Sequence, residues 1–199
     1  MTDADCEAVA EIRVRGWQHA YAGLMPKPFL DAMSVEKETV RRRAYLTEPT
    51  PGVLNLVAED AGRVVGWGCS GPCRDEDVPA GTAEVYALYV RPDRIATGVG
   101  RALMNALTAA AEEAGHETLV LWVLKENDRA RRFYTRSGLA PDGAEEPYDA
   151  AGTPVPEVRY ARPLTPPTPS GPTGSSTPTG PPTPTDSSTP TGSSSPSGV

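Results

Sequence analysis

Apolar side chains recur every three to four residues in several stretches of the chain, which is the pattern of a helix with one buried face. The first stretch contains Val9, Ile12 and Val14 and follows two candidate capping residues, Asp3 and Asp5. Further helices are expected over residues 34–45, 103–114 and 128–137. The last two end beside a glycine, the residue that most often closes a helix.

Runs of β-branched and aromatic residues separate these helices and predict strands. Residues 53–60 and 63–71 flank a tight Ala61-Gly62 turn, which is typical of a hairpin. Three more strands are expected over residues 83–90, 118–124 and 155–164. The middle one is continuously apolar, which indicates that both of its faces are covered. Helices and strands in this order predict an α/β fold with a mixed sheet.

The stretch "YVRPDRIATGVGRALM", residues 89–104, joins the end of a predicted strand to the start of a predicted helix. Pro92 ends the strand because it has no N–H to donate, and Gly98 and Gly100 lie in the turn. Unpaired N–H groups at the start of the helix, with the helix dipole, favour an anion such as phosphate. A purely structural turn is the alternative. The spacing excludes a dinucleotide fingerprint and a Walker loop.

Composition changes abruptly at Pro163. From there the chain is almost entirely Pro, Thr, Ser and Gly, holds half of the 22 prolines and has Asp186 as its one charged residue. So few apolar side chains cannot offset the ~1–2 kcal/mol per residue that ordering a backbone costs. We therefore expect one domain over residues 1–162 and a disordered tail over residues 163–199.

Charge and cysteine content narrow the class of function. The net charge of −7 argues against a general nucleic-acid binder and suits a cationic substrate. Cys6, Cys69 and Cys73 lack a paired metal-ligand spacing, so neither structural zinc nor a disulfide framework is expected. No apolar run is long enough to span a membrane and no secretory signal opens the chain. We therefore expect a cytoplasmic protein without a membrane partner.

The order of elements, the 89–104 stretch and the segment "ENDRARRFYTRSGL" together resemble the GNAT superfamily of acetyl-CoA-dependent N-acetyltransferases. The resemblance covers nearly all of residues 1–162. It implies a mixed, mostly antiparallel sheet flanked by helices, acetyl-CoA as co-substrate, no metal, and an amine acceptor that is a small molecule or a peptide. The strand with which the family usually opens is cut short before Asp3. Members of the family are often homodimers, and the sequence leaves the oligomeric state open.

The resemblance places the cofactor along the turn and the preceding strand. The family's pyrophosphate loop, Gln/Arg-x-x-Gly-x-Gly/Ala, with the residue that follows it, falls on Ile95, Ala96, Thr97, Gly98, Val99, Gly100 and Arg101. Ile95 departs from the pattern because it has no side-chain donor, and one hydrogen bond to a charged group is worth ~1.5–3 kcal/mol. Arg94 or Arg101 could compensate. The pantetheine arm is expected along the main chain of Leu88, Tyr89 and Val90.

The second segment matches the family's Asn-x-x-Ala-x-x-Phe-Tyr-x-x-x-Gly at each named position. The resemblance makes Tyr134 the expected catalytic residue, because in the family this hydroxyl lies beside the thioester sulfur and can protonate the departing thiolate. Asn127 is expected to cap its helix and to contact the cofactor. Ala130 and Phe133 are interpreted as core residues.

The acceptor must lose a proton before it attacks, because an alkylammonium with a pKa near 10.4 is only about one part in 2,500 free amine at pH 7. Glu84, on the strand before the turn, is the expected general base, with a structural or simply exposed carboxylate as the alternative. His19 and His116 are weaker candidates.

The resemblance puts the acceptor pocket between the first two helices. Trp17 and Tyr21 lie there and can hold an amine through cation–π contacts, or they can pack as core residues. Tyr86, two residues from Glu84, is a third substrate-binding candidate. The acidic run Asp75-Glu76-Asp77 is interpreted as a solvated loop near the same mouth.

Two functions are compatible with these features. The leading prediction is direct transfer of acetyl from acetyl-CoA to a primary amine, in a ternary complex and without a covalent acyl-enzyme. The competing one is a non-catalytic acyl-CoA-binding regulatory module, motivated by Ile95 and by the shortened opening strand. The sequence does not name the acceptor.

Overall fold

A six-stranded sheet organises residues 1–165, the part of the chain that the computed structural model describes. Its order is β1-β2-β3-β4-β6-β5, in which β3 and β4 are parallel and the other four neighbouring pairs are antiparallel. The strands are β1 (Leu54–Asp60), β2 (Arg63–Pro72), β3 (Thr82–Val90), β4 (Thr118–Leu124), β5 (Ala140–Asp149) and β6 (Pro154–Pro163). The predicted fold, a mixed and mostly antiparallel sheet flanked by helices, is confirmed.

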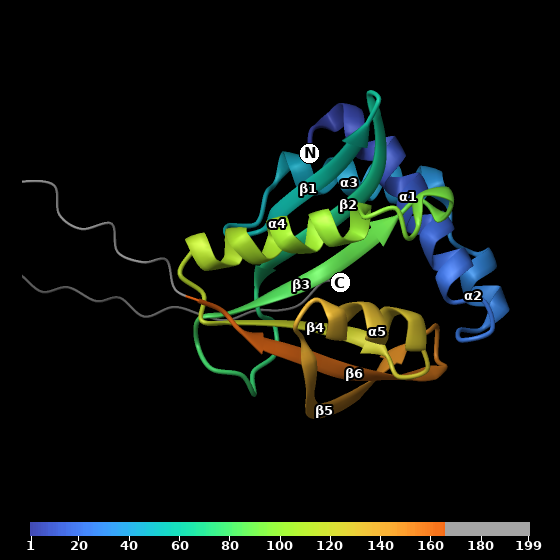
Figure 1. The fold of residues 1–199 in the computed structure, drawn as a ribbon. Coiled ribbons are helices and arrows are strands. Elements are labelled where there is room, and N and C mark those ends of the chain that lie inside the picture. Colours follow the sequence, from blue (N-terminus) through green and yellow to red (C-terminus); the bar gives the residue numbers. More distant parts are fainter. Residues whose placement is uncertain (166–199) are drawn as a thin grey trace, which may run out of the picture. The chain divides into compact units, whose positions relative to one another are not determined.

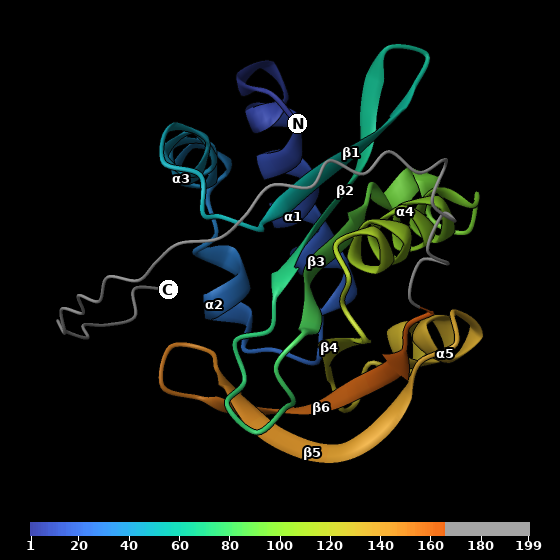
Figure 2. The same cartoon turned by 90° about the vertical axis from the view of Figure 1, so that its left-hand side faces the viewer.

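The helices cover both faces of this sheet. They are η1 (Asp3–Asp5), α1 (Cys6–Ala20), α2 (Lys27–Asp31), α3 (Val35–Thr47), η2 (Pro92–Arg94), α4 (Val99–Glu113) and α5 (Asp128–Arg136). Figure 1 shows α4 and α5 in front of the sheet, and Figure 2 shows α1, α2 and α3 on the opposite side. Among the helices of residues 1–165, none has the length and apolar character to cross a lipid bilayer.

Several helix ends lie where the sequence predicts them. Ser34 caps α3 by accepting a hydrogen bond from the Lys37 N–H at 3.2 Å, and Asn127 caps α5 by accepting one from the Ala130 N–H at 3.1 Å. Gly138 follows α5 with a φ of 84°, a left-handed conformation that favours glycine. Asn127 and Gly138 thus mark the two ends of α5, the helix that carries the predicted catalytic tyrosine.

The packing of α4 on β2 depends on two residues without side chains. A Cβ on Gly66 would lie 2.8 Å from Val99 Cγ1, and one on Gly68 would lie 2.9 Å from Leu107 Cδ1. These glycines therefore form a shallow trough in the sheet into which the apolar face of α4 fits. Because Val99 is the first residue of α4, the trough also sets the position of the preceding turn.

Two elements are absent from the sequence prediction. The sequence of β5, "APDGAEEPYD", contains two prolines and a glycine and is mostly exposed, so it has no strand periodicity and depends on pairing with β6. The short helix α2 follows Pro26 and holds Pro28 in its first turn, and the sequence prediction does not include it. In addition, Leu164 is buried and donates its N–H to Glu117 at 2.8 Å, so the folded unit continues past the expected boundary at residue 162. The predicted tail lies, from residue 166 on, outside the described residues.

The loop between β2 and β3 is fixed to the far strands by one buried arginine. Arg159 on β6 donates to Asp75 at 2.8 Å and to Asp77 at 2.7 Å, and it also donates to Asp142 on β5 at 2.7 Å. The indole N–H of Trp122 donates to Asp75 at 3.0 Å. The interpretation of this acidic run as a solvated loop is therefore wrong for Asp75, whose side chain is 17% exposed, whereas Asp77 also binds Arg159 but keeps a 65% exposed side chain.

Replacing Gly66 by alanine should lower the free energy of unfolding by about 1–3 kcal/mol, because the new methyl group overpacks the α4 contact. Gly16→Ala is the matched control, since its Cβ would meet Tyr89 at an ordinary 3.4 Å inside a helix. Chemical denaturation of both variants tests this. Equal stability of Gly66→Ala and the native chain would show that the trough is not tightly packed.

Replacing Arg159 by methionine should lower the melting temperature by several degrees at neutral pH. Hydrogen bonding to Arg159 lowers the pKa of Asp77 in the folded protein, so this pair stabilises the fold above the ordinary Asp pKa of 3.8 and loses its effect as the pH falls through the lowered folded value. The difference from the native chain should therefore be largest at pH 6–8 and shrink below about pH 4. Thermal melts in both pH ranges measure this difference in melting temperature. Arg15→Met is the control, because Arg15 forms an exposed ion pair with Glu11. A difference independent of pH would contradict the role of this ion pair.

Candidate active site

The parallel pairing of β3 with β4 ends early. It joins Thr82, Ala83 and Glu84 to Thr118, Leu119 and Val120. A β-bulge follows at once, since Cys69 pairs with Ala87 while Ser70 pairs with Val85, which leaves Tyr86 as the extra residue of β3. Bulges bend a strand and increase its twist. Figure 1 shows β3 and β4 separating toward their carboxyl ends.

The divergence leaves one backbone edge of β3 without a strand partner. Leu88, Tyr89 and Val90 pair with β2 on one side, and within residues 1–165 no strand pairs with them on the other. An extended chain can add to such an edge through main-chain hydrogen bonds. The predicted position of the pantetheine arm is therefore geometrically open.

The turn after β3 has the backbone of an anion site. Ala96 has a φ of 65° and Gly98 a φ of 98°, so the chain reverses sharply just before α4. Gly98 is the N-cap of α4 and forms no side-chain capping hydrogen bond. The N–H groups of the first turn of α4 thus lack both an intrahelical acceptor and a side-chain acceptor. The side chain of Thr97 donates to the Arg94 carbonyl at 2.7 Å and helps to hold this turn.

The side chains around the turn indicate which residue could supply the hydrogen-bond donor that Ile95 lacks. Ile95 is half-buried and ends η2. Arg94 forms an ion pair with Asp60, whereas Arg101 is exposed on the first turn of α4. Of the two arginines considered from the sequence, Arg101 is therefore the better placed to contact a phosphate. A Cβ on Gly100 would lie 3.5 Å from Val90 and 3.6 Å from Phe133, which are ordinary contact distances, so a side chain larger than a methyl group would meet β3 and α5.

Three phenols from separate elements converge beside the open strand ends. Burial raises the pKa of Tyr134 on α5 well above its ordinary value, and the nearby Tyr89 phenol on β3 raises it further. Burial also raises the pKa of Tyr21 at the end of α1, with contributions from both Tyr89 and Tyr134. All three hydroxyls therefore keep their protons at neutral pH. Tyr134 is held by ring contacts with Phe133 at 5.3 Å and Tyr160 at 6.4 Å.

Aromatic side chains surround these phenols on the α1 and α2 side. The Trp17 ring lies 4.9 Å from Tyr21, 5.7 Å from Tyr148 and 6.5 Å from Tyr89, and Phe29 lies 6.2 Å from Tyr148. Trp17 is 7% exposed, which agrees with the alternative that it packs as a core residue. Its indole N–H is nevertheless buried without a hydrogen-bond acceptor among residues 1–165.

Glu84 is not free in this arrangement. It is 1% exposed, and its carboxylate accepts hydrogen bonds from Arg74 Nε at 3.0 Å and from the Arg74 backbone N–H at 3.2 Å. The geometry favours the structural alternative for Glu84 over the role of general base. Tyr86 lies under the same arginine, 4.4 Å from its guanidinium, and donates its hydroxyl to the Pro72 carbonyl. Tyr86 is therefore outside the aromatic group around Trp17.

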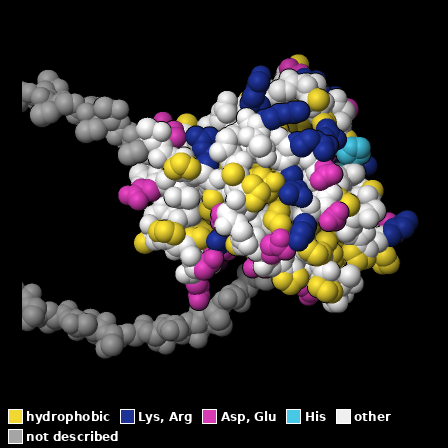
Figure 3. Space-filling model, turned by 60° about the horizontal axis from the view of Figure 1, so that its bottom comes forward, with side chains coloured by type: hydrophobic (Ala, Val, Ile, Leu, Met, Phe, Trp, Pro, Cys, Tyr) yellow, Lys and Arg dark blue, Asp and Glu magenta, His cyan; other side chains and the backbone are white. Residues whose placement is uncertain are grey.

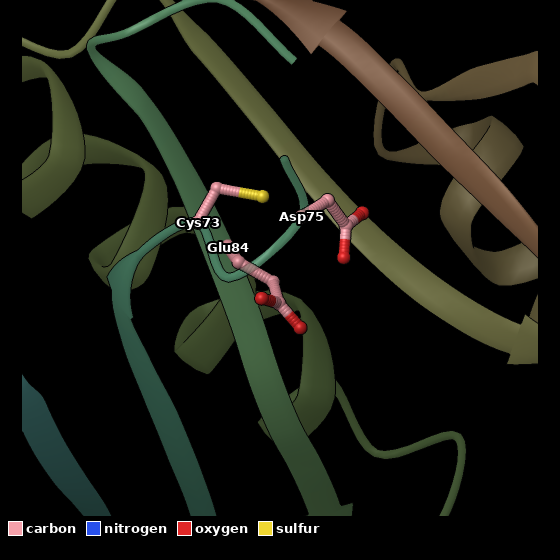
Figure 4. A group of neighbouring side chains, drawn as sticks. All are labelled: Cys73, Asp75 and Glu84. Atoms are coloured by element: carbon pink, nitrogen blue, oxygen red, sulfur yellow. The ribbon is translucent and has the colours of Figure 1, made fainter. Parts of the chain in front are cut away.

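Figure 4 shows Cys73, Asp75 and Glu84 as neighbours, with Glu84 on β3. Their candidate ligand atoms lie within 4.8 Å of one another, a spacing that a metal ion could bridge. However, Arg74 binds Glu84 and Arg159 binds Asp75, and burial raises the pKa of the Cys73 thiol so that it stays protonated. This donor set is already neutralised by arginine, and we do not assign it to a metal.

Neither histidine stands out as a candidate base. His116 precedes β4, at the opposite end of that strand, where its Nδ1 lies 3.0 Å from the Gly81 carbonyl oxygen. His19 is exposed near the end of α1.

One carboxylate near the site was missed by the sequence prediction. Glu157 on β6 lies opposite Leu124, the last residue of β4, and opposite Glu146 on β5. It is half-buried, and burial together with the charge of Glu146 raises its pKa to about 7. Alternation along "VPEVRY" could have placed Glu157 on one face of its strand. The sequence prediction lacks β5, however, so it could not place Glu146 opposite Glu157.

The exposed side of α5 is basic in a chain whose net charge is −7. The described residues form, among others, two shallow surface hollows of about 280 and 350 Å³. The second is lined by Asp128, Arg131, Arg132, Thr135, Arg136 and Tyr160. Figure 3 shows Lys and Arg side chains gathered in the upper right of the view, with Asp and Glu side chains among and below them. The basic side of α5 attracts anions.

Comparisons with known proteins agree with this geometry. Residues 13–139 match the model of the Acetyltransferase (GNAT) family. An uncharacterised N-acetyltransferase of Mycobacterium tuberculosis is 31% identical over 144 residues, covering 72% of this chain and 86% of that protein. The L-amino acid N-acyltransferase of Escherichia coli is 29% identical over 137 residues, covering 68% and 74%.

A solved structure has the same fold. The PaiA N-acetyltransferase of Thermoplasma acidophilum, in complex with coenzyme A, superposes with a TM-score of 0.62 at 18% identity, covering 82% of this chain and 96% of that one. The family match spans both the strand-turn-helix and the α5 segment. This chain therefore belongs to the GNAT family of acetyltransferases.

Proposed function

We propose that this protein transfers an acetyl group from acetyl-CoA directly to a primary amine. The observation that carries the proposal is the early end of the β3–β4 pairing, which leaves the edge of Leu88–Val90 open beside the N-terminus of α4. One bound molecule can then contact backbone groups at two places, the open edge of β3 and the start of α4. A phosphopantetheine chain has the matching chemistry, an amide-containing arm that ends in a pyrophosphate.

The residues around the turn fit this co-substrate. The first-turn N–H groups of α4 would bind the pyrophosphate, with Gly98 supplying the left-handed turn and Gly100 the space beside Phe133. Ala96, Thr97 and Val99 would contribute backbone contacts, and Asn127 would contact the cofactor near the start of α5. The exposed Arg101 would replace the donor that Ile95 lacks. A protein of the same fold has been solved in complex with coenzyme A, which is compatible with this choice of co-substrate.

The chemistry at the thioester needs a proton for the leaving sulfur. When the amine nitrogen bonds to the acetyl carbon and the C–S bond breaks, the electron pair of that bond stays on sulfur. Tyr134 is protonated at neutral pH, since the ordinary phenol pKa is already about 10 and burial raises it further, so it can donate to this sulfur and later recover a proton released by the nitrogen. Tyr134 is therefore the proposed catalytic acid.

The simplest test measures free thiol released from acetyl-CoA in the presence of a mixed pool of primary amines. Amine-dependent release supports the enzyme. Binding of coenzyme A without any release would favour the competing proposal, an acyl-CoA-binding regulatory module of the same fold.

Gly100→Val should abolish coenzyme A binding, because the larger side chain fills the space between Val90 and Phe133. Gly98→Val should also weaken it, since valine disfavours a φ of 98°. Ile95→Gln should tighten binding roughly ten- to a hundredfold if the missing donor matters. Calorimetry with coenzyme A measures all three. Unaltered affinity in both valine variants would remove the phosphate-loop assignment.

Tyr134→Phe should keep the ring contacts and remove only the hydroxyl. We expect stability and coenzyme A affinity to change little and kcat to fall by roughly ten- to a thousandfold. Steady-state kinetics on an amine that the native protein acetylates provides the measurement. A native rate in Tyr134→Phe, with chemistry shown to limit turnover, would make Tyr134 a packing residue.

A further inference from the structure

Two carboxylates face each other across β5 and β6 without an intervening cation. Glu146 and Glu157 are direct cross-strand partners, and neither forms an ion pair within residues 1–165. Like charges directly opposite each other in a sheet are destabilising. Neighbouring carboxylates on the same strands are neutralised, since Lys125 binds Glu145 and Arg159 binds Asp142. Within residues 1–165, Glu146 and Glu157 are therefore the one pair of carboxylates directly opposite each other on β5 and β6, and neither has a cationic partner.

The pair lies beside the aromatic group at the open strand ends. Glu157 is opposite Leu124, and Leu124 is 2% exposed and packs in one cluster with Trp17. Tyr148 and Val155, two residues along from Glu146 and Glu157 on their strands, pair with each other and contact the same cluster. Alternation along a strand puts residues two apart on one face. Glu146 and Glu157 thus share the face that carries the aromatic rings.

A second observation points to a ligand at this place. The indole N–H of Trp17, on a side chain that is 7% exposed, has no hydrogen-bond acceptor among the described residues. Buried polar groups are almost always hydrogen-bonded, so this unpaired donor beside the aromatic rings leaves a place for an acceptor atom of a bound molecule, such as a carbonyl oxygen. Trp17 contacts Tyr21, Tyr89 and Tyr148, the same rings that adjoin the carboxylate pair.

We propose that Glu157, with Glu146 opposite, binds the ammonium group of the acceptor and takes its proton, and that the acceptor is a cationic amine without a neighbouring carboxylate. The inference rests on the proposed acetyl transfer. One N–H bond of the ammonium breaks and its proton moves to a Glu157 oxygen, which leaves the nitrogen lone pair free to attack the acetyl carbon. The proton then passes to solvent. An amino acid would bring its own carboxylate toward two others and is disfavoured.

The charges around Glu157 are compatible with this role. The titratable and charged groups that influence it or that it influences are Glu146, Tyr148, Tyr21, Tyr89, Glu84 and Arg74. Burial and Glu146 raise the pKa of Glu157 to about 7, whereas Arg74 acts to lower it. A base poised near neutral pH is the most effective proton acceptor at that pH.

The experiment compares two amines with the amino acids that differ from them by one carboxylate: tyramine with tyrosine, and 1,4-diaminobutane with ornithine. Turnover is followed by thiol release from acetyl-CoA, and binding by thermal shift in the presence of coenzyme A. At least one amine should exceed its amino acid tenfold or more in kcat/KM. No preference for either amine in turnover or in binding would overturn the inference.

Three variants assign the base. Glu157→Gln should lower kcat/KM for the preferred amine by ~10²–10⁴-fold and remove the rise of activity with pH near 7, while coenzyme A affinity stays within twofold. Glu146→Gln should move that rise to lower pH, because loss of its negative charge lowers the pKa of Glu157. Glu145→Gln, on the same strand and paired with Lys125, is the matched control and should leave the profile unchanged.

The outcomes separate the two proposals. Thiol release that survives in Glu157→Gln with its pH profile intact overturns this inference and leaves acetyl transfer standing, and loss of the profile in Glu84→Gln instead would make Glu84 the base. Failure of the native protein to bind coenzyme A would overturn the proposed function itself.

Discussion

The short parallel pairing between β3 and β4 is the constraint on which the site depends. Three residue pairs hold the two strands together, and the bulge at Tyr86 then bends β3 away. If the pairing continued, β4 would occupy the edge of Leu88–Val90 and the sheet would have no opening. Backbone groups that a sheet normally satisfies internally are instead available to a ligand. On its other edge β3 pairs with β2 from Ala83 to Val90, with Tyr86 as the bulged residue.

The surrounding elements keep this opening in place. The trough made by Gly66 and Gly68 positions α4, so that its first turn starts beside the end of β3. Arg159 ties the β2–β3 loop to β5 and β6 through three carboxylates and thereby fixes the closed end of the divergence. The aromatic group of α1, α2 and β5 covers the other face. Packing and ion pairs thus hold the backbone at both ends of the divergence, which suits a reaction that depends on the orientation of its reactants.

Local sequence signals predicted much of this arrangement. The strand-turn-helix of residues 89–104 and the segment around Tyr134 are continuous in the chain, so the positions of Gly98, Asn127 and the helix starts could be predicted from neighbouring residues. Glu157 could not, because its environment depends on β5, an exposed strand with prolines that only pairing with β6 makes extended. The ion pair of Asp75 with Arg159 spans 84 residues, a separation at which sequence patterns give no indication of contact.

Hydrogen exchange at single residues, with and without coenzyme A, tests the central claim most directly. If the ligand adds to the open edge of β3 and binds the helix start, amide protection should increase at Leu88–Val90 and at Gly98–Arg101. The amides of the β1–β2 hairpin, which lie outside the opening, should be unaffected and provide the internal reference. Binding of coenzyme A with protection elsewhere, and none at the edge of β3 or at the start of α4, would contradict the account.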